Sequence, residues 1–170
     1  MIRLLGAAML TAGCGCLGLS AVNRLDGRVR DLRELSAGLE VLQRELGWRL
    51  APLPEALEAA AAVTHGRTAE FFTFCAQGSK RLAGIPFRTL WGRGLEQSPL
   101  RLSREDRALL EPLGSILGRY DGDSQRQAVE NVMAGLEHLS IQAEDDRRRL
   151  GRVYSVLGVT GGLFLALMLI

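Results

Sequence analysis

Between residues 25 and 46, hydrophobic residues recur at steps of three or four positions. This spacing places seven of them on one stripe of an α-helix: Leu25, Val29, Leu32, Leu35, Leu39, Leu42 and Leu46. The residues between them are mostly arginine and glutamate, which fall on the other faces of the helix. No proline precedes Pro52 in the chain. The pattern therefore predicts one long, unbroken first helix.

This first helix begins inside an apolar segment, and the chain ends in another. Residues 4–22 contain no charged side chain and are about as long as a membrane span. Residues 153–170 are also uncharged and just long enough to span. We expect transmembrane segments at residues 1–23 and 153–170, with a helical domain at residues 24–152 between them.

Two other interpretations of the N-terminal segment stay open. The segment is short and rich in small residues, as cleaved signal peptides are. Residues 11–14 end in a small residue before Cys14, as lipoprotein signals do, and a lipid on Cys14 would place the domain outside the cell. A retained anchor is favoured because the apolar stretch continues past Cys14.

Prolines and glycines divide the middle of the chain into shorter helices. We expect them at residues 54–63, from Thr68 to about residue 82, from Pro86 to about residue 97, after Ser103 as far as residue 117, and from about residue 124 onward. The last helix runs into the C-terminal apolar segment. The expected fold is all-α: a bundle of about six helices, of which the first and last are long.

Three local features of these helices can be checked. Thr68 is expected to cap the third helix, and Ser103 with Asp106 resembles a capping box. Pro112 should kink the fifth helix near Ala108, because it has no N–H to donate there. The predicted inward residues of helices three to six are Phe71, Phe72, Cys75, Ala76, Leu82, Phe87, Leu90, Trp91, Leu95, Leu109, Leu110, Leu113, Ile116, Leu117, Val129, Val132, Leu136, Leu139 and Ala143.

Composition argues against several classes of function. The formal charge is +2, and acidic residues alternate with arginine almost throughout, so no basic face for nucleic acid is expected. His65 and His138 are far apart, and neither has a ligand four residues on, so no metal site is expected. The chain has no nucleophile elbow, phosphate-binding loop or dinucleotide motif. We expect neither an enzyme nor a cofactor nor a small-molecule substrate.

Arginines flank both apolar segments on the side of the central domain. They are Arg24, Arg28, Arg30 and Arg33 after the first segment and Arg147, Arg148, Arg149 and Arg152 before the second, against Arg3 alone on the other side. The positive-inside rule then predicts a cytoplasmic central domain. The same arginines could contact anionic lipid headgroups, so a lipid-binding or membrane-shaping protein is the alternative class.

Several segments resemble a known family when read in order. They are Leu-Leu-Gly-Ala at residues 4–7, Pro-Leu-Pro-Glu-Ala-Leu at 52–57, Leu-Gly-Arg-Tyr-Asp at 117–121 followed by Gln125 and Gln127, and the apolar end at Ile170. Together they resemble the stage III sporulation protein AB family of endospore-forming bacteria. The resemblance covers essentially the whole chain, including both apolar ends.

This resemblance implies a function. The family is expected in the mother-cell membrane facing the forespore, as part of a channel-like complex joining the two cells. Its central domain is similar to the cytoplasmic F-type platform domains of type II secretion and type IV pilus machines. By that analogy it would dock the stage III AA ATPase onto the other stage III A complex members, an inference from fold rather than from a site.

The candidate partner-binding residues lie in the turns expected at the end of the bundle away from the membrane. They are Leu53 and Glu55 in the first turn and Arg119, Tyr120 and Asp121 in the second. For any one of them, turn formation or helix capping is the simpler role.

Overall fold

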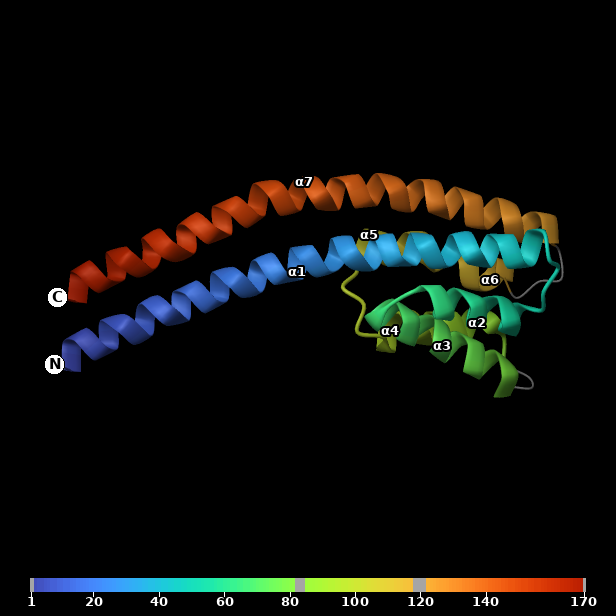
Figure 1. The fold of residues 1–170 in the computed structure, drawn as a ribbon, viewed down its shortest axis with the longest axis horizontal. Coiled ribbons are helices and arrows are strands. Elements are labelled where there is room, and N and C mark those ends of the chain that lie inside the picture. The colour runs from blue at the N-terminus through green and yellow to red at the C-terminus, as the bar shows by residue number, and fades with distance from the viewer. Residues whose placement is uncertain (1, 82–84, 118–121, 170) are drawn as a thin grey trace. The chain divides into compact units, whose positions relative to one another are not determined.

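The structure, a computed structural model, describes residues 2–81, 85–117 and 122–169. For residues 2–19, 21, 122, 123 and most of those after Gly151, it describes the backbone alone. All seven elements within these ranges are helices, and the described residues include no strand: α1 (Ile2–Gly47), α2 (Leu53–Val63), α3 (Gly66–Arg81), α4 (Phe87–Gln97), α5 (Arg104–Leu110), α6 (Leu113–Leu117) and α7 (Gly122–Leu169) (Figure 1). The predicted all-α class is confirmed.

The chain divides into two compact units. One contains Met1–Val29 and Ile141–Ile170, and the other contains Arg30–Ser140. The second unit holds all of α2 to α6 with parts of α1 and α7, and we call it the central unit. Each unit is described by itself below.

The first unit pairs the N-terminal part of α1 with the C-terminal part of α7. Its described side chains include two ion pairs between these helices, Asp26 with Arg147 and Arg28 with Asp146, the latter at 3.7 Å. Among the described residues, no helix has a stretch that is both long enough and apolar enough for a membrane span. The two predicted transmembrane segments fall largely on residues whose side chains lie outside that description.

The predicted hydrophobic stripe of α1 is confirmed, and it forms part of the buried core. Six of its seven residues, from Val29 to Leu46, are buried, and Leu25 is half-buried. In the central unit α1 lies between α7 and the α2–α4 group (Figure 1). Gln43 of α1 donates to Glu130 of α7 at 2.7 Å. Toward the other neighbour, Gly38 leaves space for the ring of Phe72 in α3.

An aromatic cluster joins α3, α4 and α5. Phe71 packs edge-to-face on Phe72 and on Trp91, with ring centroids 5.3 Å and 4.9 Å apart. The indole N–H of Trp91 donates to the Leu110 carbonyl at 2.9 Å. Such edge-to-face pairs add to the free energy gained by burial. Of the predicted inward residues, Phe87, Leu109, Ile116 and Leu139 are only half-buried, Leu82 lies outside the described residues, and the others are buried.

The start of the third helix differs from the sequence prediction, which capped it with Thr68. The second helix, α2, ends at Val63 as predicted, and the hydroxyl of Thr64 donates to the Ala60 carbonyl at 2.9 Å. Gly66 opens α3 with a φ of 57°, a left-handed conformation that favours glycine. Thr68 was therefore wrongly predicted as the cap, and it lies fully buried inside α3.

Pro112 breaks the predicted fifth helix rather than bending it. The helix ends at Leu110 as α5, and a new helix, α6, begins at Leu113. Pro112 has no N–H to offer the carbonyl four residues earlier. The chain resumes with the tighter bonds Gly114 N–H to Glu111 O at 3.2 Å and Ser115 N–H to Pro112 O at 3.1 Å. This break gives seven helices where about six were expected. By contrast, the predicted capping box of Ser103 and Asp106 is confirmed.

A carboxylate lies within the apolar packing of α1. Asp31 is only 3% exposed. It accepts two hydrogen bonds from the Arg67 guanidinium, at 3.0 Å and 2.9 Å, and one from the Arg101 backbone N–H at 2.7 Å. Bidentate arginine–carboxylate pairs fix both distance and angle. Asp31 therefore ties α1 to α3 and to the segment that precedes α5.

Replacing Gly38 by alanine should destabilise the protein. A Cβ at this position would lie 2.3 Å from Cε2 of Phe72, inside the core. Overpacking of this kind costs about 1–3 kcal/mol of unfolding free energy. Urea denaturation of the purified chain, followed by circular dichroism, measures the change.

Gly92→Ala is the matched control, because its Cβ would meet nothing within 4 Å. Helix propensity alone should then stabilise that variant by up to about 1 kcal/mol. Equal stability of Gly38→Ala and the unaltered chain would contradict the close packing of α1 on α3.

Replacing Asp31 by alanine should cost about 3 kcal/mol of unfolding free energy, because it leaves the Arg67 guanidinium without its buried partner. The control is Glu58→Ala, which removes the exposed ion pair with Lys80, 2.6 Å long. That change should cost less than about 1 kcal/mol. The same urea titration compares the two variants. Similar losses of unfolding free energy would show that the buried pair of Asp31 contributes no more to stability than an exposed ion pair.

Candidate functional site

The connection between α1 and α2 is held firmly by its backbone. The N–H groups of Trp48 and Arg49 donate to the Arg44 carbonyl at 3.0 Å and 3.4 Å, and Ala51 N–H donates to the Glu45 carbonyl at 3.0 Å. These bonds satisfy carbonyls that the end of α1 leaves unpaired. We call residues 48–52 the α1–α2 loop.

The start of α2 fixes the other side of this loop. Pro52 is the N-cap residue, and its carbonyl accepts from the N–H groups of Glu55 at 2.9 Å and Ala56 at 3.1 Å. Pro54 occupies the first turn, where proline costs no hydrogen bond. The run of two prolines thus stops α1 from continuing and sets the position at which α2 begins.

The structure brings together the two predicted partner-binding residues that it describes. Leu53 opens α2 and is half-buried, and Glu55 is exposed in the first turn. The carboxylate of Glu55 lies at the positive end of the helix dipole. The other three predicted residues, Arg119, Tyr120 and Asp121, lie outside the described residues.

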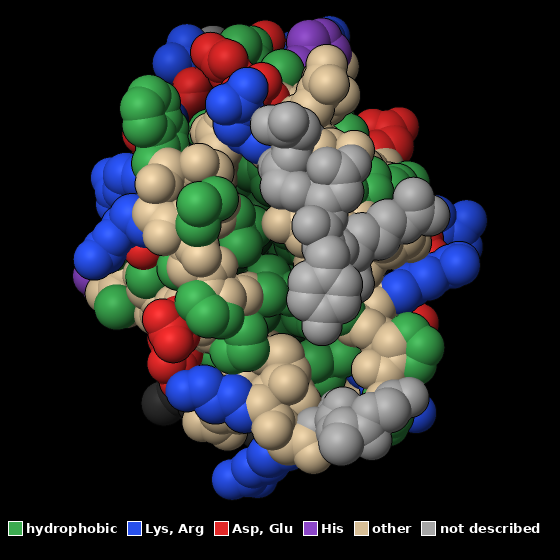
Figure 2. Space-filling model, turned by 90° about the vertical axis from the view of Figure 1, so that its right-hand side faces the viewer, with side chains coloured by type: hydrophobic (Ala, Val, Ile, Leu, Met, Phe, Trp, Pro, Cys, Tyr) green, Lys and Arg blue, Asp and Glu red, His purple; other side chains and the backbone are tan. Residues whose placement is uncertain are grey.

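Glu55 borders a shallow polar depression of about 420 Å³. Glu45, Arg49, Leu50 and Pro52 also line it. Inside it Arg49 donates to the Glu45 carboxylate at 3.2 Å and 3.4 Å. The molecular face toward this end carries apolar, acidic and basic side chains side by side (Figure 2).

Sequence reasoning missed the two most exposed apolar residues of this region. Trp48 is 83% exposed and Leu50 is 80% exposed, the highest values among the large hydrophobic residues whose side chains are described. Leu50 also has a φ of 50°, the left-handed region. The available signal was a tryptophan placed between the last residue of the predicted α1 stripe and Pro52.

A second depression, of about 500 Å³, lies between the α5–α6 pair and α7. Its walls are mainly apolar and include Pro112, Ile116 and Val132, while Gln127 and Asn131 supply polar groups. Gln125, two residues before Gln127, is buried and donates to the Leu117 carbonyl at 3.0 Å, so it holds α7 against the end of α6.

Cys75 and His65, whose side chains could take part in chemistry, contribute to the fold instead. Burial raises the pKa of the Cys75 thiol to about 12, so it stays protonated and unreactive at neutral pH. His65 lies 3.5 Å from the Glu34 carboxylate, which also accepts from its backbone N–H at 2.9 Å. No cluster of three potential metal ligands occurs among the described residues.

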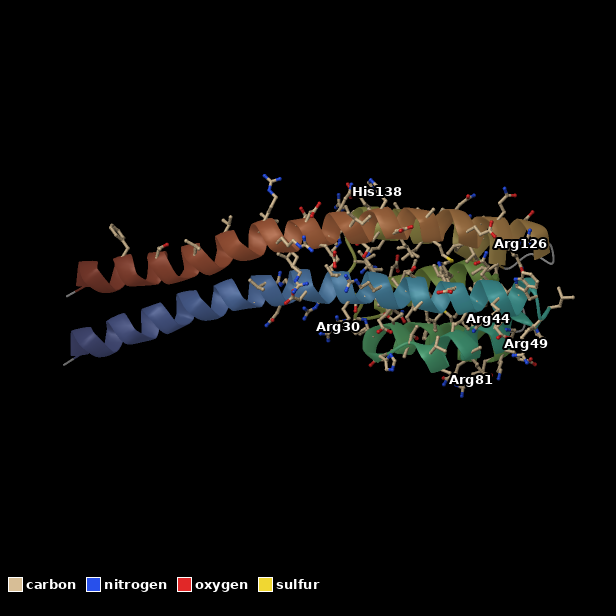
Figure 3. All side chains as sticks on the ribbon, turned by 45° about the horizontal axis from the view of Figure 1, so that its top comes forward. Arg30, Arg44, Arg49, Arg81, Arg126 and His138 are labelled. Atoms are coloured by element: carbon tan, nitrogen blue, oxygen red, sulfur yellow. The ribbon has the colours of Figure 1, made fainter. Side chains whose placement is uncertain are left out.

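Exposed basic side chains are spread over the central unit rather than gathered on one face. Figure 3 shows Arg30 and Arg44 on α1, Arg81 on α3 and Arg126 on α7, pointing in different directions. Arg126 lies 3.9 Å from Glu130 on the same helix. A surface that follows a nucleic acid backbone would need these charges in line.

Comparison with known proteins decides the family. A family model described as stage III sporulation protein AB matches residues 3–170. The chain belongs to the stage III sporulation protein AB family. The prediction made from its sequence segments is confirmed, and with it a role in sporulation. The family's name describes no chemical reaction.

Individual family members agree with this assignment. The curated stage III sporulation protein AB of Bacillus subtilis (strain 168) is 26% identical over an alignment of 172 residues, and the alignment covers 99% of each chain. A solved structure of a stage III sporulation protein AB has a TM-score of 0.65 at 24% identity. The match covers 71% of this chain and 96% of that one, and it shows a shared fold.

Proposed function

We propose that this chain is a membrane-anchored assembly component of the secretion-like channel complex that joins mother cell and forespore. Its central unit would dock a cytoplasmic ATPase of the stage III AA type onto the other stage III A complex members. The observation that carries the proposal is the family match over residues 3–170, which extends through both apolar ends of the chain.

Membrane attachment is part of the proposal. Residues 1–23 and 153–170 would be the transmembrane segments and residues 24–152 the cytoplasmic domain, similar to the F-type domains of type II secretion. The charge-free sequence of residues 4–22 and 153–170 supports this division. So do the bounds of α1 and α7, since each helix includes one proposed anchor and also supplies residues to the central unit.

The orientation follows from the arginines that flank the proposed anchors. They stand on the side of the central unit, which would therefore lie in the mother-cell cytoplasm, at the mother-cell membrane that faces the forespore. A lipid on Cys14 would invert this arrangement. The side chain of Cys14 lies outside those described, and the protein would then carry a diacylated N-terminus that mass spectrometry can detect.

The ion pairs of the first unit favour docking over lipid binding. Arg28 and Arg147 already have carboxylate partners in Asp146 and Asp26. Those carboxylates offset positive charge that would otherwise attract anionic lipid headgroups. The arginines near the proposed anchors thus support placement at an interface more than a membrane-shaping activity.

A binding assay tests the proposal. The full chain in lipid nanodiscs should bind the purified ATPase, and Arg119→Glu combined with Asp121→Arg should weaken that binding about tenfold or more if the second turn takes part. Helicity by circular dichroism should not change. The control is Arg93→Glu with Glu96→Arg, a charge exchange of the same kind between exposed residues of α4.

Two results would contradict the proposal or its site. Absence of ATPase binding by the unaltered chain, together with a response only to the fraction of anionic lipid, would favour the lipid-binding alternative. Unchanged binding by the Arg119 and Asp121 variant would exclude those two residues from the docking surface.

A further inference from the structure

Leu50 holds a backbone conformation that leucine rarely adopts. Its φ is 50°, where the Cβ crowds the backbone at a cost that glycine avoids. At 80% exposure the Leu50 side chain gains almost no packing in return. The left-handed turn itself serves the fold, because it closes the end of α1 with the bond from Ala51 N–H to the Glu45 carbonyl. Glycine would form this turn without strain, so the exposed leucine side chain is the feature that the fold does not explain.

Trp48 lies two residues before Leu50 in the α1–α2 loop. It is 83% exposed, and it belongs to the same loop that backbone hydrogen bonds to Arg44 and Glu45 hold in place. The backbone that presents both side chains is therefore held in place and is not a frayed helix end. Tryptophan side chains presented on a rigid element are the residues that most often dominate the free energy of a protein interface.

The charge beside Leu50 indicates what the partner must carry. The carboxylate of Glu55 makes no hydrogen bond or ion pair with any residue whose side chain the structure describes. It lines the same depression as Leu50, together with Glu45 and Arg49. A partner side chain that is cationic at its tip and apolar along its stem matches Leu50 and Glu55 together.

We propose that Trp48 and Leu50 are the anchors of the docking surface: they insert into an apolar pocket of the ATPase, and Glu55 pairs with an arginine or lysine at the rim of that pocket. The inference rests on the proposed function, since it assigns the contact by which the ATPase would bind. Trp48 and Leu50 were not among the partner-binding residues predicted from the sequence, whereas Glu55 was.

Two other occupants fit the surface less well. An anionic lipid surface would be repelled by the Glu55 carboxylate. A second copy of the chain offers the apolar depression between α5–α6 and α7, but the polar groups lining it, Gln127 and Asn131 among them, are uncharged. That depression holds no cation for Glu55, so a partner with a basic rim is the better match.

The test is the affinity of the full chain in lipid nanodiscs for the purified ATPase, measured by biolayer interferometry. Trp48→Ala and Leu50→Gly should each weaken binding about tenfold or more. Glu55→Arg should also weaken it, by a factor that shrinks as salt rises. The control is Phe74→Ala, which truncates a side chain that is 39% exposed on α3 and should change affinity less than about twofold.

Leu50→Gly separates binding from folding. Because glycine relieves the strain at φ 50°, the melting temperature of this variant should stay the same or rise while its affinity falls. A clear drop in melting temperature alongside weaker binding would show that Leu50 serves the fold, and it would overturn the inference.

The remaining outcomes distinguish the two proposals. If the unaltered chain binds no ATPase, the proposed function fails and the inference fails with it. If the chain binds but Trp48→Ala and Leu50→Gly bind equally well, the docking surface lies elsewhere while the function stands. Loss of self-association in these variants, without loss of ATPase binding, would assign the surface to a second copy and overturn the inference.

Discussion

The buried carboxylate of Asp31 is the constraint on which the central unit depends. A charge inside an apolar stripe is tolerated only when it is fully paired, and here Arg67 and the Arg101 backbone provide that pairing. These partners come from α3 and from the segment before α5, so one side chain fixes the positions of three parts of the chain. The geometry that satisfies Asp31 is also the one in which Phe72 fits against Gly38 and the aromatic cluster closes.

This rigid body explains how the α1–α2 loop can remain strained and exposed. The loop joins α1, whose stripe is buried along its length, to α2, whose Ala56, Leu57 and Ala60 are buried. Both ends of the loop are therefore anchored in the core, and its backbone hydrogen bonds leave it little freedom. A core of this kind can hold a residue such as Leu50 in an unfavourable conformation. The α1–α2 loop is therefore where the fold supports the proposed docking function.

Much of the fold could be predicted because it depends on local patterns. Helical periodicity located the α1 stripe and the buried face of α3, and the spacing of Ser103 and Asp106 located a cap. The pairing of Asp31 with Arg67 had no such signal, since the two residues are 36 positions apart and periodicity says nothing about which charges meet. The predicted kink at Pro112 became a break, and which of the two occurs depends on packing against neighbouring helices.

Of the candidate site, Leu53 and Glu55 were found from the turn. Trp48 and Leu50 were missed, because exposure is a property of the assembled fold.

The central claim is that this helical body works on the cytoplasmic side of the membrane by holding other proteins. Its most direct test is the accessibility of one introduced thiol, Arg44→Cys, with Cys14 and Cys16 replaced by serine. Arg44 is exposed, whereas Cys75 is buried with a pKa of about 12 and should not react. The probe is a membrane-impermeant maleimide added to sporulating cells, and the chain without Arg44→Cys is the control. The account predicts no labelling of intact cells and full labelling after permeabilisation. Labelling of intact cells would place the body outside the cytoplasm and contradict the account.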